Sequence, residues 1–148
     1  MLKGIPTQIS SDLLKALADM GHGDYLVIAD DFYPPHSKTP NGVSIPAKGN
    51  TAPEMIDAIL ELFPLDVDYE PYPILYMVPD PEAGAAIQQR PKVWDKVIEV
   101  AEKHGLEKDR IGTIERTKFY EKAAGAYLTV CTSEREPYGC FILQKGVM

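Results

Sequence analysis

Apolar residues follow two kinds of spacing along the chain, a helical spacing and short unbroken runs. The helical spacing predicts helices over residues 9–21, 51–63, 91–104 and 117–124. The unbroken and nearly unbroken runs predict strands over residues 25–29, 42–45, 72–78, 110–114, 126–132 and 140–145. This order of elements is typical of an α/β protein, in which helices cover a sheet.

Polar and small residues mark where two of these helices begin and end. Ser10 or Ser11 can cap the first helix, and Gly21 is expected to end it in a left-handed conformation. Thr51 and Glu54 have the spacing of a capping box, which predicts the start of the second helix.

The chain is expected to form one domain over residues 1–148, because no repeat, linker or change of composition divides it. Residues 30–41 contain three prolines and are predicted to form a loop. The last two strands, joined by a loop over residues 133–139, are predicted to pair as a C-terminal β-hairpin. The expected fold is therefore a single-domain α/β sheet flanked by helices and ending in a hairpin.

Composition limits the classes of partner and compartment. The chain has 148 residues, of which 45% are hydrophobic, and a net charge of −7. An acidic protein is a poor partner for nucleic acid or an anionic membrane. The sequence contains no apolar run of membrane-spanning length, no signal-peptide pattern and only two cysteines, Cys131 and Cys140. We therefore expect a cytoplasmic protein with reduced thiols.

His22 and Asp30 are the first candidates for chemistry. His22 lies between two glycines, which leave an imidazole accessible for moving a proton near neutral pH, although a turn histidine can also serve only as a helix cap. Asp30 follows a buried strand, and ligands of α/β sheets collect at strand ends. About 20 Å of extended chain separates the two residues. One shared site would therefore need a curved loop or a subunit boundary.

The remaining candidates are one arginine and two tyrosines. Arg116 can bind a hydroxyl or an anion, or form only a surface ion pair. Tyr120 and Tyr138 can stack on a sugar or donate a hydrogen bond, although buried tyrosines often belong to the core. The spacing of the histidines and aspartates between residues 22 and 36 matches no metal-ligand motif, so no metal site is predicted.

Several motifs together resemble one known family, that of L-fucose mutarotase and D-ribose pyranase. They are spread over nearly the whole chain, and the most specific is Met-Gly-His-Gly-Asp at residues 20–24. The others are Met-Leu-Lys-Gly-Ile at 1–5, Ile-Ala-Asp at 28–30, Phe-Pro-Leu-Asp at 63–66, Arg116 with Phe-Tyr-Glu at 119–121, Tyr-Gly at 138–139 and Ile-Leu-Gln-Lys-Gly-Val at 142–147. The resemblance implies a ring-like homo-oligomer, a decamer or octamer, with sites between subunits. It also implies exchange of sugar anomers, or of pyranose and furanose forms, without a cofactor.

The resemblance also implies roles for individual residues. It places the catalytic histidine at His22 and the sugar-binding residues at Asp30, Arg116 and Tyr120, and it maps the family's Tyr-Gly-Asn segment onto Tyr138, Gly139 and Cys140. Two positions depart from the family pattern, Cys140 in place of asparagine and Phe32 in place of a polar residue. A thiol is a much weaker hydrogen-bonding group than an amide, so these positions bear on the identity of the sugar.

The resulting hypothesis is a mutarotase that opens and closes the sugar ring by general acid–base chemistry. His22 would move the proton, Asp30 and Arg116 would hold hydroxyl groups, and Tyr138 would donate or relay a proton. A non-catalytic monosaccharide-binding protein of the same fold is the alternative.

Overall fold

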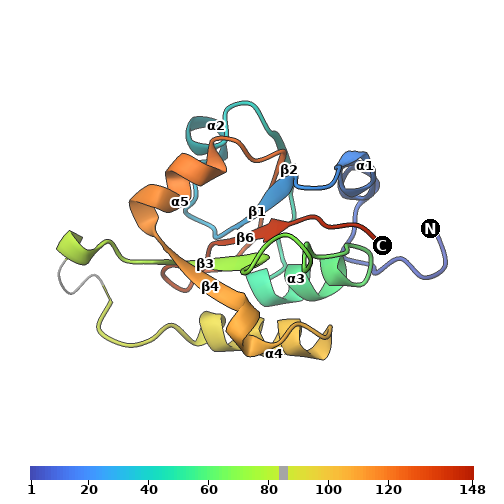
Figure 1. Cartoon of the computed structure of the whole chain (residues 1–148). Coiled ribbons are helices and arrows are strands. Elements are labelled where there is room, and N and C mark those ends of the chain that lie inside the picture. Colours follow the sequence, from blue (N-terminus) through green and yellow to red (C-terminus); the bar gives the residue numbers. More distant parts are fainter. Residues whose placement is uncertain (84–86) are drawn as a thin grey trace.

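A six-stranded sheet forms the middle layer of the protein (Figure 1). The computed structural model describes residues 1–83 and 87–148. The strand order is β2-β5-β1-β6-β3-β4, and β6 runs antiparallel to both of its neighbours whereas the other pairs are parallel. The strands are β1 Tyr25–Ala29, β2 Val43–Pro46, β3 Ile74–Val78, β4 Ile111–Glu115, β5 Leu128–Cys131 and β6 Phe141–Gln144.

Helices cover both faces of the sheet (Figure 1). One face packs against α1 Ser11–Asp19, α3 Ala52–Leu60 and α4 Lys92–Lys103. The other face carries α2 Pro35–Lys38 and α5 Arg116–Ala123. Two short 3-10 helices, Pro81–Ala83 and Lys108–Arg110, complete the described elements.

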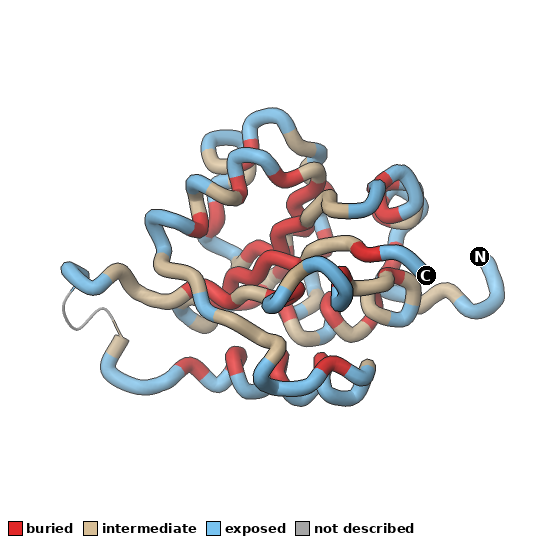
Figure 2. Tube along the Cα trace, viewed as in Figure 1, coloured by how far each residue is buried: buried red, intermediate tan, exposed pale blue. Residues whose placement is uncertain are grey.

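Each face of the sheet has its own apolar core, because alternate residues of a strand point to opposite faces. Leu26 and Ile28 of β1 point into the larger core, and Val27 and Ala29 point into the smaller one. Strand β1 is buried on both faces from Leu26 to Ala29, as the apolar run predicts, and only Tyr25 at its start is half-buried. Figure 2 shows the buried positions gathered along the central strands.

The predicted α/β class, single sheet and helical positions are confirmed, but the end of the first helix is not. Thr51 and Glu54 form the predicted capping box at α3. Helix α1 ends at Asp19, and Met20 after it is extended. Of the two glycines that flank His22, Gly23 is left-handed, with φ 85°, and Gly21 is not. The prediction was wrong because Gly21 is held instead by a hydrogen bond from its amide to the Asp24 carboxylate, at 2.7 Å.

The predicted C-terminal hairpin is also wrong. Strands β5 and β6 do not pair with each other, because β1 lies between them and pairs with both. The loop between them crosses the carboxyl end of β1, where the Thr132 amide donates to the Ala29 carbonyl at 3.0 Å. The segment predicted as a loop over residues 30–41 contains the one-turn helix α2.

No helix in the described part of the chain is long and apolar enough to cross a membrane. The structure contains one chain, so the expected ring-like oligomer stays a prediction.

Candidate active site

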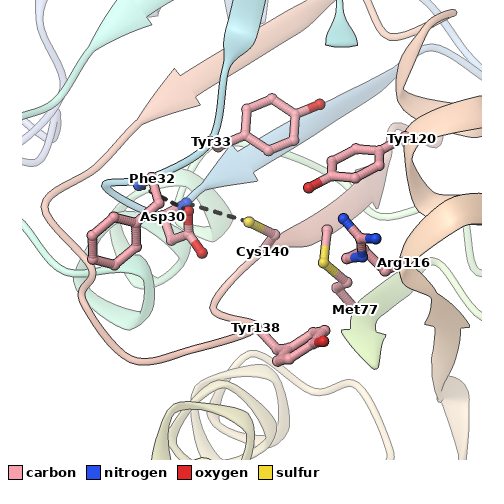
Figure 3. A pocket seen from close by; sticks show the side chains of 8 residues that line it. All are labelled: Asp30, Phe32, Tyr33, Met77, Arg116, Tyr120, Tyr138 and Cys140. Carbon is pink, nitrogen blue, oxygen red and sulfur yellow. Dashed lines mark hydrogen bonds between the residues drawn. The ribbon is translucent and has the colours of Figure 1, made fainter. Parts of the chain in front are cut away.

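A pocket of about 140 Å³ opens at one edge of the sheet (Figure 3). Figure 3 shows Asp30 and Arg116 on opposite sides of it, with Cys140 between them. The lining combines charged, aromatic and sulfur-containing side chains: Asp30, Phe32, Tyr33, Met77, Arg116, Tyr120, Tyr138 and Cys140. Five of the predicted site residues, Asp30, Arg116, Tyr120, Tyr138 and Cys140, therefore come together.

The sheet topology explains why these residues meet. The carboxyl ends of parallel strands lie at one edge of a sheet, and antiparallel β6 begins at that same edge. Phe141 of β6 pairs with both Ile28 and Tyr76, so Cys140 lies between the ends of β1 and β3. The Asp30 amide consequently donates to the Cys140 sulfur at 3.5 Å. Arg116 follows β4, the next strand of the same edge.

Asp30 is a partly buried carboxylate. One of its oxygens accepts a hydrogen bond from the Phe32 amide at 3.1 Å. Burial raises the pKa of Asp30 above its ordinary value, a rise that the hydrogen bond from Phe32 only partly offsets, and the nearby charge of Glu134 raises the pKa further. The charged form of Asp30 therefore costs folding free energy.

This cost predicts that Asp30→Asn is at least as stable as the unchanged protein at pH 7 while it binds sugar more weakly. A raised carboxyl pKa means that the folded state holds the proton more tightly, so stability falls as pH rises from the ordinary aspartate pKa through the raised one. Melting curves between pH 3 and 8 should show the variant gaining stability relative to the unchanged protein across that window. If the difference in melting temperature between the two proteins does not change with pH, the raised pKa of Asp30 is contradicted.

Arg116 is positioned by the segment that follows β3. Its Nε lies 3.7 Å from an Asp80 oxygen, and its guanidinium lies 5.6 Å from the centre of the Tyr120 ring. Asp80 also accepts hydrogen bonds from the amide and hydroxyl of Thr117, and these lower the pKa of Asp80. Burial raises the pKa of Tyr120, which keeps its hydroxyl protonated. The arginine thus faces the pocket as a fixed cation beside a neutral phenol.

Tyr138 and Gly139 lie on the loop that crosses the end of β1. Tyr138 has a φ of 58°, which is left-handed and rare for a residue other than glycine. Gly139 is buried, and a Cβ there would lie 2.7 Å from the Glu134 side chain and 3.7 Å from the Asp30 Cβ. The predicted Gly139 therefore allows the loop to pass close to the Glu134 side chain, although it does not line the pocket.

Cys140 supplies a neutral thiol to the pocket. It is 2% exposed, and burial raises its pKa well above the ordinary value for a thiol. Cys131 belongs to β5 and contacts the Ser44 hydroxyl at 3.4 Å. Both cysteines are free, as predicted.

His22 does not join the pocket within one chain. It precedes β1 and lies at the opposite edge of the sheet, where the Gly23 amide donates to the Lys145 carbonyl. Its Nε2 lies 3.3 Å from Asp66 Oδ2, and its ring centre lies 4.9 Å from that of Tyr69. The imidazole is 39% exposed, and the Asp66 carboxylate is 3% exposed. A buried carboxylate thus orients an accessible imidazole.

Sequence reasoning gave no role to four residues that the structure places at these two positions. Tyr33 and Met77 line the pocket, and Asp66 and Tyr69 contact His22. Tyr33 and Met77 carry no distinguishing signal, because both resemble core residues in the sequence. Asp66 belongs to the Phe-Pro-Leu-Asp motif, and this motif could have identified it as a site residue.

A separate group of side chains at the carboxyl ends of α3 and α4 has spacing suited to a cation. Asp57, Glu61 and His104 offer ligand atoms within 4.8 Å of one another. Lys103 already pairs with Asp57 at 2.9 Å, and His104 Nε2 lies 2.7 Å from the same carboxylate. The lysine charge therefore already pairs with one of the three candidate ligands, and none of these residues lines the pocket.

Comparison with known proteins gives matches over nearly the whole chain. The model of the RbsD / FucU transport protein family matches residues 3–148. Fucose mutarotases from Danio rerio and Homo sapiens are 40% and 41% identical over 150 residues, and the matches cover 100% and 99% of this chain and 95% and 94% of those proteins. The crystal structure of the fucose mutarotase in complex with L-fucose from Streptococcus pneumoniae is 40% identical, with a TM-score of 0.89 over 99% of each chain.

Proposed function

We propose that this chain, which belongs to the RbsD / FucU transport protein family, is an isomerase that interconverts the anomers of a monosaccharide. The proposed sugar is L-fucose. The observation that carries the proposal is the gathering of Asp30, Arg116, Tyr120 and Tyr138 around one small pocket. Charged and phenolic groups of this kind hold sugar hydroxyls. The protein would thus act in carbohydrate metabolism.

The reaction needs only proton transfer and ring opening. The ring oxygen gains a proton as its bond to the anomeric carbon breaks, and the anomeric hydroxyl loses a proton as the carbonyl forms. Rotation about the bond between C1 and C2 and the reverse steps give the other anomer. No electrons leave the sugar and each step is a proton transfer, so the chemistry needs no redox cofactor and can be carried by acidic and basic side chains.

The side chains suit distinct parts of this reaction. Asp30 accepts hydrogen bonds from hydroxyl groups, and Arg116 donates them. Tyr138 donates to, or relays a proton from, the ring oxygen. His22 moves the second proton, and Asp66 holds its imidazole in one orientation. The neutral Cys140 thiol and Met77 give the pocket an apolar side.

The separation of His22 from the pocket supports a site shared between subunits. His22 and the pocket both reach solvent, at opposite edges of the same sheet. A second chain can therefore bring its His22 against the pocket of the first. A ring-like homo-oligomer, a decamer or octamer, repeats this contact at every subunit. The two free thiols fit a reducing compartment, and we place the protein in the cytoplasm.

The test is anomer exchange measured by NMR saturation transfer with L-fucose and with D-ribose. The purified protein is expected to accelerate exchange of L-fucose in proportion to its concentration, and D-ribose less. Heat-denatured protein at the same concentration and pH serves as the control. Exchange at the uncatalysed rate with both sugars would contradict the proposal.

The same experiment, together with calorimetry, distinguishes the enzyme from the alternative, a non-catalytic sugar-binding protein. That alternative is favoured by the distance between His22 and the pocket within one chain, which leaves a single subunit with binding groups but no imidazole. Sugar binding by calorimetry without accelerated exchange would select it.

A further inference from the structure

Three contacts hold the loop that carries Tyr138 against the starts of two helices, α4 and α3. The indole Nε1 of Trp94 donates to the Tyr138 carbonyl at 3.0 Å. The Glu136 carboxylate accepts from the Val93 amide at 3.0 Å, in the first turn of α4. The neighbouring Glu134 carboxylate accepts from the Ala52 amide at the start of α3. Two helix starts are therefore anchored to one loop.

These contacts fall where the loop is strained. A left-handed conformation is unfavourable for a residue with a side chain, so surrounding contacts must hold Tyr138 in it. The Trp94 indole binds the carbonyl of that same residue. The indole is itself fixed, because it is 5% exposed, its ring lies 4.9 Å from that of Tyr76, and the Arg90 guanidinium lies 5.3 Å from its centre.

Glu136 is the cap that α4 otherwise lacks. Pro91 at the start of this helix has no side-chain oxygen to accept a hydrogen bond from the first turn. A carboxylate at a helix start also interacts favourably with the helix dipole. The loop and the helix therefore stabilise each other at a point two residues from Tyr138.

We infer that Trp94 and Glu136 are positioning residues that hold the backbone of Tyr138 so that its ring faces the sugar pocket. This inference rests on the proposed function, because Tyr138 is placed there among the groups that act on the sugar. Neither Trp94 nor Glu136 lines the pocket, so both act through the loop.

The test compares four proteins: the unchanged chain, Trp94→Phe, Tyr138→Ala and the double variant. Phenylalanine keeps an aromatic ring against Tyr76 and removes the N–H. We expect Trp94→Phe to lower kcat/KM for L-fucose about tenfold, because a misplacement of 1 Å can cost ~100-fold. In the Tyr138→Ala background the same change should have no further effect, because Trp94 acts only through Tyr138.

Val97→Ala is the matched control on the same helix. Val97 is fully buried and lies among core residues, so this variant should lower the melting temperature without changing the exchange rate of the folded protein. Equal losses of kcat/KM from Trp94→Phe in both backgrounds, or no loss in either, would overturn the inference.

A second measurement detects the hydrogen bond from Trp94 to the Tyr138 carbonyl without an activity assay. Trp94 is the only tryptophan, so its indole gives a single ¹H–¹⁵N signal. We expect slow hydrogen exchange of this N–H in the unchanged protein and faster exchange in Glu136→Ala. Absence of accelerated anomer exchange in the unchanged protein would defeat the proposed function alone. Indole exchange at the rate of free indole in the unchanged protein would defeat the positioning role.

Discussion

Replacing His22 with alanine is expected to slow anomer exchange of L-fucose by ~100- to 10,000-fold, the usual contribution of a positioned general acid or base. Sugar binding should remain measurable, because the hydroxyl-holding groups belong to the pocket at the other edge of the sheet. Stability should change little, because the imidazole is 39% exposed. NMR exchange, calorimetry and a melting curve on the same sample give the three readouts.

Mixing variants distinguishes a shared site from a site within one chain. Chains with His22→Ala and chains with Tyr138→Ala are each expected to be slow. Co-assembled, they should regain part of the activity, because some contacts then combine an intact His22 with an intact Tyr138. No regain on co-assembly would argue against a site between subunits, and undiminished exchange by the single His22 variant would remove this residue from the mechanism.

Replacing Gly139 with alanine is expected to destabilise the protein by about 1–3 kcal/mol, the range for an added methyl group in a packed interior. The new Cβ would lie 2.7 Å from the Glu134 side chain. That side chain cannot move freely, because its carboxylate accepts from the amides of Ala52, Arg135 and Glu136. The loop must therefore shift away from Glu134, which displaces the neighbouring Tyr138, and sugar exchange should fall together with stability.

Thermal melting checks the prediction, at about 2–4 °C per kcal/mol for a chain of this size. Gly21→Ala is the control for stability, because a Cβ at Gly21 would meet only an Asp24 oxygen at an ordinary 3.6 Å. If Gly139→Ala and the unchanged protein melt at the same temperature, the Glu134 side chain can move to accommodate the new methyl group, and the prediction is wrong.

The sequence predicts the elements of this fold better than their pairing. Apolar runs identify β1 and the first three residues of β6, because burial on both faces disfavours polar residues there. Pairing depends on residues far apart in the chain, and the hairpin prediction failed because β1 lies between β5 and β6. Helix α2, a single turn, is too short to show a helical period.

The site could be predicted only where its residues carry chemistry or belong to a motif. Asp30 follows a strand, and Tyr138 and Arg116 belong to family motifs, so all three were found. Met77 was not found. In the sequence, an apolar residue near the end of a strand looks the same whether it lines a pocket or belongs to the core. The contact between Trp94 and the Tyr138 carbonyl joins residues 44 positions apart and involves the backbone, which no side-chain pattern reports.

The central place of β6 has a consequence for how the protein is made. This strand is the last in the chain, and it joins β1 to β3 in the middle of the sheet. Until residues 141–144 leave the ribosome, both of those strands expose an unpaired edge, which favours association with other chains. A nascent chain stalled before β6 should therefore depend on chaperones.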